Sequence, residues 1–194
     1  GGVCLNEGCI PTKTLLRSAH LLSEALEGKK YGVTIPEASF ELSKVMSRKT
    51  KILKKLGAGI RLGLQNHGVE IVTEEARLTG KTADGFTIAA GESSYSARRV
   101  IIATGSKAFI PPIDGLSDVP YWTAREALEV EELPKSIVVL GGGVIGMEFV
   151  SLFSTLGVDV TVVEMLPKIL GPMDEELSTE LQQAFEKRKV KFHL

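Results

Sequence analysis

The predicted fold is decided by the stretch Leu140-Gly141-Gly142-Gly143-Val144-Ile145-Gly146-Met147-Glu148. Three of its glycines have G-x-G-x-x-G spacing, after an apolar β-branched run at 136–140 and before an apolar helical pattern at 144–156. The next strand-like run, 158–164, ends in Glu164, eighteen positions after Gly146. A strand, a glycine-rich turn, a helix and a second strand ending in an acidic residue together predict a dinucleotide-binding turn.

Each glycine of this pattern has a separate expected role. Gly141 permits the tight turn, Gly143 lets the main chain approach a pyrophosphate, and Gly146 allows the helix to pack closely on the strand. The helix N-terminus should bind the phosphates through its free N–H groups. We expect Glu164 to accept hydrogen bonds from the adenosine ribose and to repel a 2′-phosphate, which favours NAD over NADP. The alternative is a glycine-rich turn that binds nothing.

Strands and helices alternate from this turn to the end of the chain. A helix at 174–188 and a strand at 190–194 complete a β-α-β-α-β pattern, which predicts an α/β fold with a parallel sheet. The run Pro111-Pro112-Ile113-Asp114-Gly115 indicates a linker. We therefore predict two partial domains, 1–115 and 116–194.

The first half of the chain is predicted to hold two helices and three strands. Gly1-Gly2 indicates a tight loop, and the first helix should end at Gly28, with Pro11 perturbing its early part. Apolar spacing predicts the second helix over 45–64 and strands over 69–73, 86–90 and 95–102. Three glycines within the second helical pattern nearly match the dinucleotide spacing but follow no strand, so we discard them: Gly57, Gly59 and Gly63.

Cys4 and Cys9 are the only cysteines of the chain. A bridge that closes so short a loop removes little entropy from the unfolded chain, so stability alone does not explain it. Residues five apart in a regular helix diverge beyond the roughly 7 Å that a disulfide tolerates. The bridge would need a distorted turn, and a distorted disulfide is more easily reduced, which favours a redox role. Two alternatives stay open: small buried apolar residues, or half of a metal site.

Composition excludes several classes of function. The 194 residues carry 23 basic and 24 acidic side chains, which gives no electrostatic case for a nucleic-acid or anionic-membrane partner. No apolar run reaches the length of a membrane span, and two cysteines are too few for a disulfide scaffold, which favours a reducing compartment. The chain begins inside a motif and ends inside a predicted strand, so we expect it to be an excerpt, truncated at both ends.

Three motifs in this order resemble the flavin-dependent disulfide reductases. The run from Gly1 to Lys13 is similar to the family's active-site segment, Ala103-Thr104-Gly105-Ser106 to its second FAD-contacting segment, and Gly141–Glu148 to its NAD-binding turn. Leu5 and Ile10 are more similar to the dihydrolipoamide dehydrogenases than to the glutathione or mercuric reductases. The resemblance implies a Rossmann-like, two-domain FAD/NAD(P)-binding architecture, with FAD in 1–115 and NAD in 116–194.

The resemblance also implies residue roles. Cys4 would be the interchange thiol that the dithiol substrate attacks, and Cys9 the thiol that faces the flavin in a charge-transfer contact. Lys13 would lie near the flavin and pair with Glu148, and a helix N-terminus near the thiols would favour the thiolate. FAD would be contacted by Ala76, Thr104, Gly105 and Ser106. The NAD turn would comprise Gly141, Gly142, Gly143, Val144, Ile145, Gly146, Met147 and Glu148, with Glu164 on the ribose.

The activity implied is re-oxidation of protein-bound dihydrolipoamide through the Cys4–Cys9 disulfide and FAD, with hydride transfer to NAD⁺. The implied partners are a second copy of the chain and the lipoyl domains of 2-oxo acid dehydrogenase or glycine cleavage complexes, in a bacterial cytoplasm or a mitochondrial matrix. No metal is expected. None of His20, His67 and His193 lies in the family's acid–base motif, so we expect no full turnover by this chain alone. The alternatives are another flavin disulfide reductase and a catalytically incompetent nucleotide-binding fragment.

Overall fold

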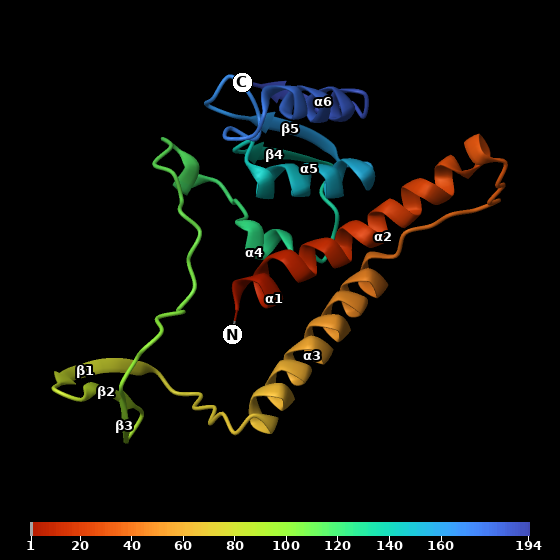
Figure 1. The fold of residues 1–194 in the computed structure, drawn as a ribbon. Coiled ribbons are helices and arrows are strands. Elements are labelled where there is room, and N and C mark those ends of the chain that lie inside the picture. The colour runs from red at the N-terminus through yellow and green to blue at the C-terminus, as the bar shows by residue number, and fades with distance from the viewer. Residues whose placement is uncertain (1) are drawn as a thin grey trace. The chain divides into compact units, whose positions relative to one another are not determined.

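The computed structural model describes residues 2–194 (Figure 1), so half of the predicted Gly1-Gly2 loop lies outside the described residues. Contacts divide the chain into two compact units. The first comprises the residues up to Lys54 together with Ala108–Leu194, and the second is Lys55–Lys107. This grouping does not follow the boundary predicted at residue 115, because the first helices pack with the C-terminal half. The assignment of the two cofactor domains stays a prediction.

The C-terminal part of the first unit is the predicted β-α-β-α-β pattern. Its elements are β4 (Ser136–Leu140), α5 (Val144–Thr155), β5 (Asp159–Val163), α6 (Glu175–Glu186) and β6 (Lys191–His193). The three strands are parallel in the order β4-β5-β6, with Ser136 opposite Asp159 and Thr161 opposite Lys191. The predicted parallel α/β sheet is confirmed.

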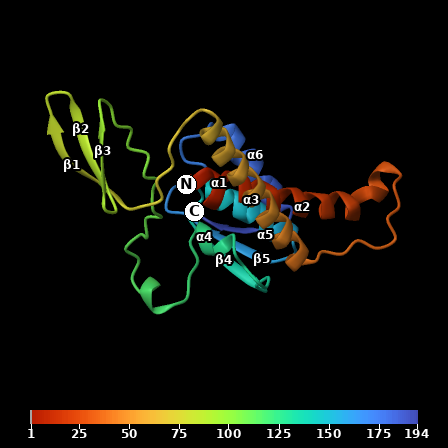
Figure 2. The same cartoon turned by 90° about the horizontal axis from the view of Figure 1, so that it is seen from below.

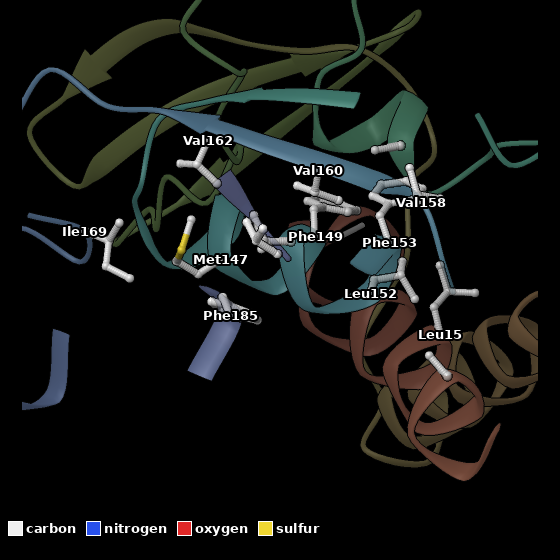
Figure 3. Packing of buried hydrophobic residues seen from close by; sticks show 14 of the residues in the cluster. Leu15, Met147, Phe149, Leu152, Phe153, Val158, Val160, Val162, Ile169 and Phe185 are labelled. Carbon is white, nitrogen blue, oxygen red and sulfur yellow. The ribbon is translucent and has the colours of Figure 1, made fainter. Parts of the chain in front are cut away.

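The core of this unit lies on one face of the parallel sheet (Figure 3). Val160 and Val162 of β5 are buried there with Phe153 of α5 and Phe185 of α6. Alternate strand residues point to opposite faces, and side chains on the other face of β4 stay accessible, with Val138 59% exposed. The parallel sheet therefore has one apolar face covered by both helices and one that is open.

The N-terminal helix is broken between the two cysteines. It consists of α1 (Val3–Glu7) and α2 (Cys9–Glu27), followed by the short 3₁₀ helix η1 (Gly28–Tyr31). If one helix ran through, the ring of Pro11 would collide with the carbonyl of Glu7, four residues earlier. The chain breaks instead at Gly8, and α2 begins with Thr12 N–H donating to the Gly8 oxygen at 3.1 Å. The predicted perturbation by Pro11 is confirmed, as is the helix end at Gly28.

Helix α2 lies along α5, and the first half of α3 (Leu42–Asn66) lies beside α2 (Figure 2). Leu15 of α2 is buried in the same core as α5. Arg48 of α3 donates to the Thr14 carbonyl of α2 at 3.1 Å. The discarded glycine pattern lies inside α3, as predicted.

Two short elements precede β4: η2 (Leu116–Asp118) and α4 (Ala124–Ala127). Thr123 and Glu126 cap the start of α4 with reciprocal hydrogen bonds. The C-terminal end of α4 is bound by Lys49 of α3, whose side chain is only 1% exposed. Its Nζ donates to the Leu128 carbonyl and to Glu129 Oε1, the latter at 2.7 Å. Trp122, just before α4, has its ring centroid 6.5 Å from that of Phe153.

The second unit contains an antiparallel sheet in the order β1-β2-β3, made of β1 (Ala76–Thr82), β2 (Gly85–Ala90) and β3 (Ser93–Ala97). The prediction for 86–90 is confirmed. The predicted strand at 69–73 is wrong, the one at 95–102 ends at Ala97, and β1 was not predicted. The apolar runs at 69–73 and 100–102 have no strand to pair with among the described residues, and an apolar run without a partner forms no ladder.

Membrane spanning is not indicated by the helices of residues 2–194. None of them combines the length and the apolar character that crossing a bilayer requires.

Candidate functional site

The glycine turn between β4 and α5 has the geometry that its sequence predicts at two positions. Gly141 has φ +105°, which side chains rarely allow, and its N–H donates to the Val163 carbonyl at 2.8 Å. A Cβ atom on Gly146 would lie 2.3 Å from the Gly141 oxygen and 3.4 Å from Val139 Cγ1 of β4, so only glycine permits this close packing of the helix on the turn and the strand. Both predicted roles are confirmed.

The third glycine of the pattern, Gly143, is the N-cap of α5. No side chain of the described residues caps this helix end, and its first turn holds no acidic residue. A Cβ atom on Gly143 would meet no atom within 4 Å, so packing within the protein does not require glycine there. An open main chain at an uncapped helix N-terminus fits the pyrophosphate of a dinucleotide.

Glu164 follows β5 and is bound to the main chain around it. Its Oε2 accepts a hydrogen bond from the Gly142 N–H at 2.6 Å, and its Oε1 accepts one from the Leu166 N–H at 2.8 Å. These bonds, that from Leu166 foremost, hold the pKa of the carboxyl below its ordinary value. The group is therefore a carboxylate at neutral pH. Its contact with a ribose stays a prediction.

The two cysteines lie on either side of the break at Gly8 and are exposed. A Cβ atom on Gly8 would lie 3.2 Å from the Val3 oxygen and 3.3 Å from the Cys4 Cα, so the turn is tight. The predicted distortion of the helix is thus present. The predicted disulfide is not formed, because Cys4 and Cys9 are free thiols joined by a side-chain hydrogen bond.

That hydrogen bond raises the pKa of the Cys4 thiol, with smaller contributions from desolvation and from the charge of Cys9. A main-chain hydrogen bond at Cys9 and the positive charge of Lys13 act in the opposite direction. In this dithiol state the thiolate is not favoured at Cys4, because the effect of the neighbouring thiol on the pKa is larger than that of Lys13. That a helix N-terminus favours the thiolate form of the thiols stays a prediction.

Lys13 of α2 forms an ion pair with Glu148 of α5. The predicted pair is confirmed, and its hydrogen bond is the main cause that raises the pKa of Lys13. Smaller contributions come from Cys9 and Cys4, so the lysine charge also acts on the dithiol. Within one unit, the pair joins the helix that begins at Cys9 to the helix that begins at the glycine turn.

The other predicted FAD contacts lie in the second unit. Thr104, Gly105 and Ser106 are in an exposed segment without regular structure, and Gly105 has φ +82°. Ala76 is the first residue of β1 and lies opposite Ala90. Their contact with FAD stays a prediction.

The sequence analysis missed several residues around these sites. Glu7, between the two cysteines, forms an ion pair with Arg125 of α4, and no sequence signal connects residues so far apart. Ile169 and Leu170 contact the glycine turn from the loop after β5. Their position just after Glu164, in a short segment bounded by Pro167 and Pro172, was the available signal.

Metal binding has no support in the part of the chain that the structure describes. Residues 2–194 contain no group of three or more His, Cys, Asp or Glu side chains placed to hold a metal ion.

The dithiol beside a dinucleotide-type turn defines a class of protein, and comparison with known families gives the same class. The family described as pyridine nucleotide-disulphide oxidoreductase matches residues 1–194, and this chain belongs to it. Its members are FAD-dependent oxidoreductases that typically bind FAD and NAD(P).

Three relatives of this chain share the name dihydrolipoyl dehydrogenase. Dihydrolipoyl dehydrogenase from Acholeplasma laidlawii is 40% identical over 182 residues, which are 91% of this chain and 53% of the relative. The Bacillus subtilis protein of that name is 37% identical over 99% of this chain and 42% of its own length. The mitochondrial one from Schizosaccharomyces pombe is 37% identical over 99% and 38%. The chain thus spans about half or less of the curated relatives it matches.

Solved structures give the same fold. LpdA from Mycobacterium tuberculosis superposes with a TM-score of 0.87 at 27% identity, over 100% of this chain and 43% of that one. The flavoprotein disulfide reductase RclA from Escherichia coli gives a TM-score of 0.80 at 24% identity, over 100% and 40%, which shows the fold alone. The chain is a mixed α/β structure that matches part of the FAD/NAD-binding region of flavoprotein disulfide reductases.

Proposed function

We propose that this chain is the dithiol and nucleotide-binding part of a dihydrolipoyl dehydrogenase. The observation that carries the proposal is the Lys13–Glu148 ion pair, which ties the dithiol helix to the helix of the glycine turn. The relatives named dihydrolipoyl dehydrogenase, at 37–40% identity, support the choice of substrate.

The dithiol half of the reaction would take place at Cys4 and Cys9, after a base of the intact enzyme deprotonates the incoming dithiol. With Cys4 and Cys9 joined as a disulfide, one sulfur of dihydrolipoamide attacks Cys4, the Cys4–Cys9 bond breaks, and a mixed disulfide forms. The second substrate sulfur then displaces Cys4. The substrate leaves as the cyclic disulfide, and its two electrons remain on Cys4 and Cys9 as two thiols. Exposure of both sulfurs allows this attack.

The remaining residues would hold the cofactors. FAD would supply the path by which the two electrons leave the dithiol for NAD⁺. The open main chain at Gly143 and the N-terminus of α5 would hold the NAD pyrophosphate, and Glu164 the adenosine ribose. Lys13 would keep a positive charge beside the dithiol, held in place by Glu148.

The proposal includes the partners of such an enzyme: a second copy of the protein, and lipoyl domains of 2-oxo acid dehydrogenase or glycine cleavage complexes. The proposed cellular location is a bacterial cytoplasm or a mitochondrial matrix. Among the relatives, the fission-yeast protein is named as mitochondrial.

The test uses the intact protein with its flavin. We expect it to form NADH from NAD⁺ and dihydrolipoamide, and we expect Cys4→Ser and Cys9→Ser each to abolish this reaction. His20→Gln is the matched control, because His20 is exposed on the same helix and should leave the rate unchanged. Reduction of a different disulfide with no oxidation of dihydrolipoamide would replace the proposal by another flavin disulfide reductase. NADH binding without any thiol turnover would leave only a nucleotide-binding role.

A further inference from the structure

The loop between β5 and α6 folds back onto the glycine turn and binds its middle residue. The Leu170 N–H donates to the Gly142 carbonyl at 2.8 Å, and Glu164 Oε2 accepts from the Gly142 N–H at 2.6 Å. Both main-chain polar groups of Gly142 are therefore bound by one segment, residues 164–170. Ile169, between these two contacts, is fully buried and belongs to the core cluster with Met147 of α5 (Figure 3).

Gly142 and Gly143 are glycines for different physical reasons. A Cβ atom on Gly142 would lie 3.0 Å from Ile169 Cγ2 and 3.3 Å from Glu164 Cγ, so these two side chains would have to move by a few tenths of an ångström to admit it. A Cβ atom on Gly143 would meet nothing within 4 Å. The protein itself crowds a side chain at Gly142, whereas only a bound ligand could crowd one at Gly143.

The loop is held in a fixed conformation. Leu170 has φ +54°, the left-handed region that a leucine adopts only when its surroundings impose it. The Met173 N–H donates to the Leu170 carbonyl at 2.7 Å, and Lys168 Nζ donates to the Met173 carbonyl at the same distance. Strained backbone conformations that are retained in this way occur preferentially at functional sites.

We propose that Ile169 and Leu170 are positioning residues for the dinucleotide turn. Together with Glu164, which binds the Gly142 N–H, they fix Gly142 and so set the main chain of Gly143 in its binding conformation before any nucleotide arrives. The inference rests on the proposed function only in naming NAD as the ligand. The coupling between Ile169 and Gly142 is a property of the chain alone.

The experiment is a double-mutant cycle in the intact protein, with the affinity for NADH as readout. Gly142→Ala should weaken NADH binding about tenfold, because a methyl group forced into a packed contact displaces the turn. Ile169→Ala removes the Cγ2 methyl that this new group would meet. The double variant should therefore bind NADH as well as Ile169→Ala alone. Additive losses would overturn the proposal.

Two matched controls separate this contact from general damage. Ile169→Val keeps the branched Cβ and the Cγ2 methyl group that lies nearest Gly142, so it should not rescue Gly142→Ala. Gly143→Ala should also weaken NADH binding, but no change at Ile169 should rescue it. Rescue by Ile169→Val, or rescue of Gly143→Ala by Ile169→Ala, would contradict the assignment.

Two further measurements distinguish positioning from stability and from failure of the proposed function. Ile169→Ala should raise the KM for NAD⁺ and leave the reduction of the Cys4–Cys9 disulfide by dihydrolipoamide unchanged; an equal loss in both would show a merely structural role. If the unsubstituted protein binds no NADH, the proposed function fails. Hydrogen exchange of the Gly142 amide then decides the coupling. Leu170→Pro removes the donor to the Gly142 carbonyl and cannot adopt φ +54°, so it disrupts the loop and should speed exchange of the Gly142 amide if the loop holds the turn. Unchanged exchange would overturn the inference.

Discussion

At the scale of single residues, the contact between Cys4 and Cys9 is the main influence on the pKa of Cys4. The hydrogen bond with Cys9 favours the protonated form of Cys4 more than Lys13 favours the thiolate. A neutral Cys4 is a poor nucleophile and a poor metal ligand, because the thiolate is the reactive form. The reduced chain therefore favours the protonated, less reactive form of Cys4.

We expect Cys9→Ala to increase the reactivity of Cys4. The hydrogen bond with Cys9 is the largest cause of the raised Cys4 pKa, so its loss should lower that pKa. The pH midpoint for alkylation of Cys4 should then fall toward that of an ordinary thiol. The midpoint can be measured from the rate of iodoacetamide labelling, with the labelled peptide identified by mass spectrometry. Lys13→Met should shift the Cys4 midpoint upward. An unchanged midpoint in Cys9→Ala would show that the sulfur–sulfur contact does not control the titration.

Glu164 should stabilise the fold in a pH-dependent way. Its pKa is lower in the folded chain than in the unfolded chain, so its contribution is present above the ordinary carboxyl pKa and is lost as the pH falls through the folded-state value. The difference in unfolding free energy between the unsubstituted protein and Glu164→Gln should therefore shrink as the pH is lowered in the acid range. Urea unfolding at several pH values measures it. Exposed Glu131→Gln is the control, and a difference that stays constant with pH would contradict the prediction.

The sequence predicts those site residues whose role depends on neighbours along the chain. Gly141 and Gly146 could be assigned because a turn and a close helix–strand contact are local requirements. The Lys13–Glu148 pair followed only from family resemblance. Ile169 could not be assigned, since a buried apolar residue in a loop has no periodic pattern, and its effect on Gly142 exists only after folding.

At the scale of secondary-structure elements, α4 contacts two other helices, α1 and α3, although it is only four residues long. Arg125 pairs with Glu7 at the end of α1, and the carbonyl of Leu128 at the other end accepts from Lys49 of α3. The cation at a helix C-terminus is favourable because carbonyl groups there lack intrahelical partners. The buried Lys49 is therefore a structural tether between α3 and α4.

Replacing Lys49 by Met should destabilise the protein by about 1–3 kcal/mol, because the Leu128 carbonyl loses its donor in a buried position. Methionine keeps much of the volume, so loss of packing contributes little. Lys51→Met on the exposed side of the same helix should change stability by less than about 0.5 kcal/mol. Equal effects of the two substitutions in urea unfolding would show that the tether contributes nothing.

Most elements could be predicted from periodicity, and the exceptions have physical causes. The helices and parallel strands from Ser136 onward agree with the prediction within one or two residues, whereas α4 was not predicted. Strand β1 was missed, although Asp84-Gly85 at its end is a hairpin signal between β1 and β2. The run at 69–73 was predicted from its apolar residues, but strand formation requires a paired edge, which composition does not reveal.

At the scale of the whole molecule, the chain is organised as two units rather than as two halves. Residues 98–107 of the second unit form an exposed segment without regular structure before the chain returns to the first unit at Ala108. Thr104, Gly105 and Ser106, the expected FAD contacts, lie in this segment. Flavin binding should therefore protect residues 98–107 from proteolysis.

We expect trypsin to cut at Lys107 early in the flavin-free protein, because proteases need an accessible and locally unfolded segment. Added FAD should slow this cut severalfold. Cleavage at the exposed Lys29 and Lys30 provides the control, since these residues are not among the expected flavin contacts and their rate should not change. Mass spectrometry of the early fragments identifies the sites. Equal protection at all three lysines would reflect general stabilisation and would refute a local contact.

The packing of Trp122 on Phe153 gives the protein a built-in optical reporter. Trp122 is the chain's single tryptophan and lies half-exposed against Phe153 near the C-terminal end of α5, in the first unit. Tryptophan emission shifts to longer wavelength when the ring leaves an apolar contact for water, so selectively excited fluorescence follows the unfolding of the first unit. The fluorescence does not report on residues 55–107, because they contain no tryptophan. A mismatch between fluorescence and circular dichroism during denaturation would then reveal, without any label, the separate melting of the β1-β2-β3 sheet.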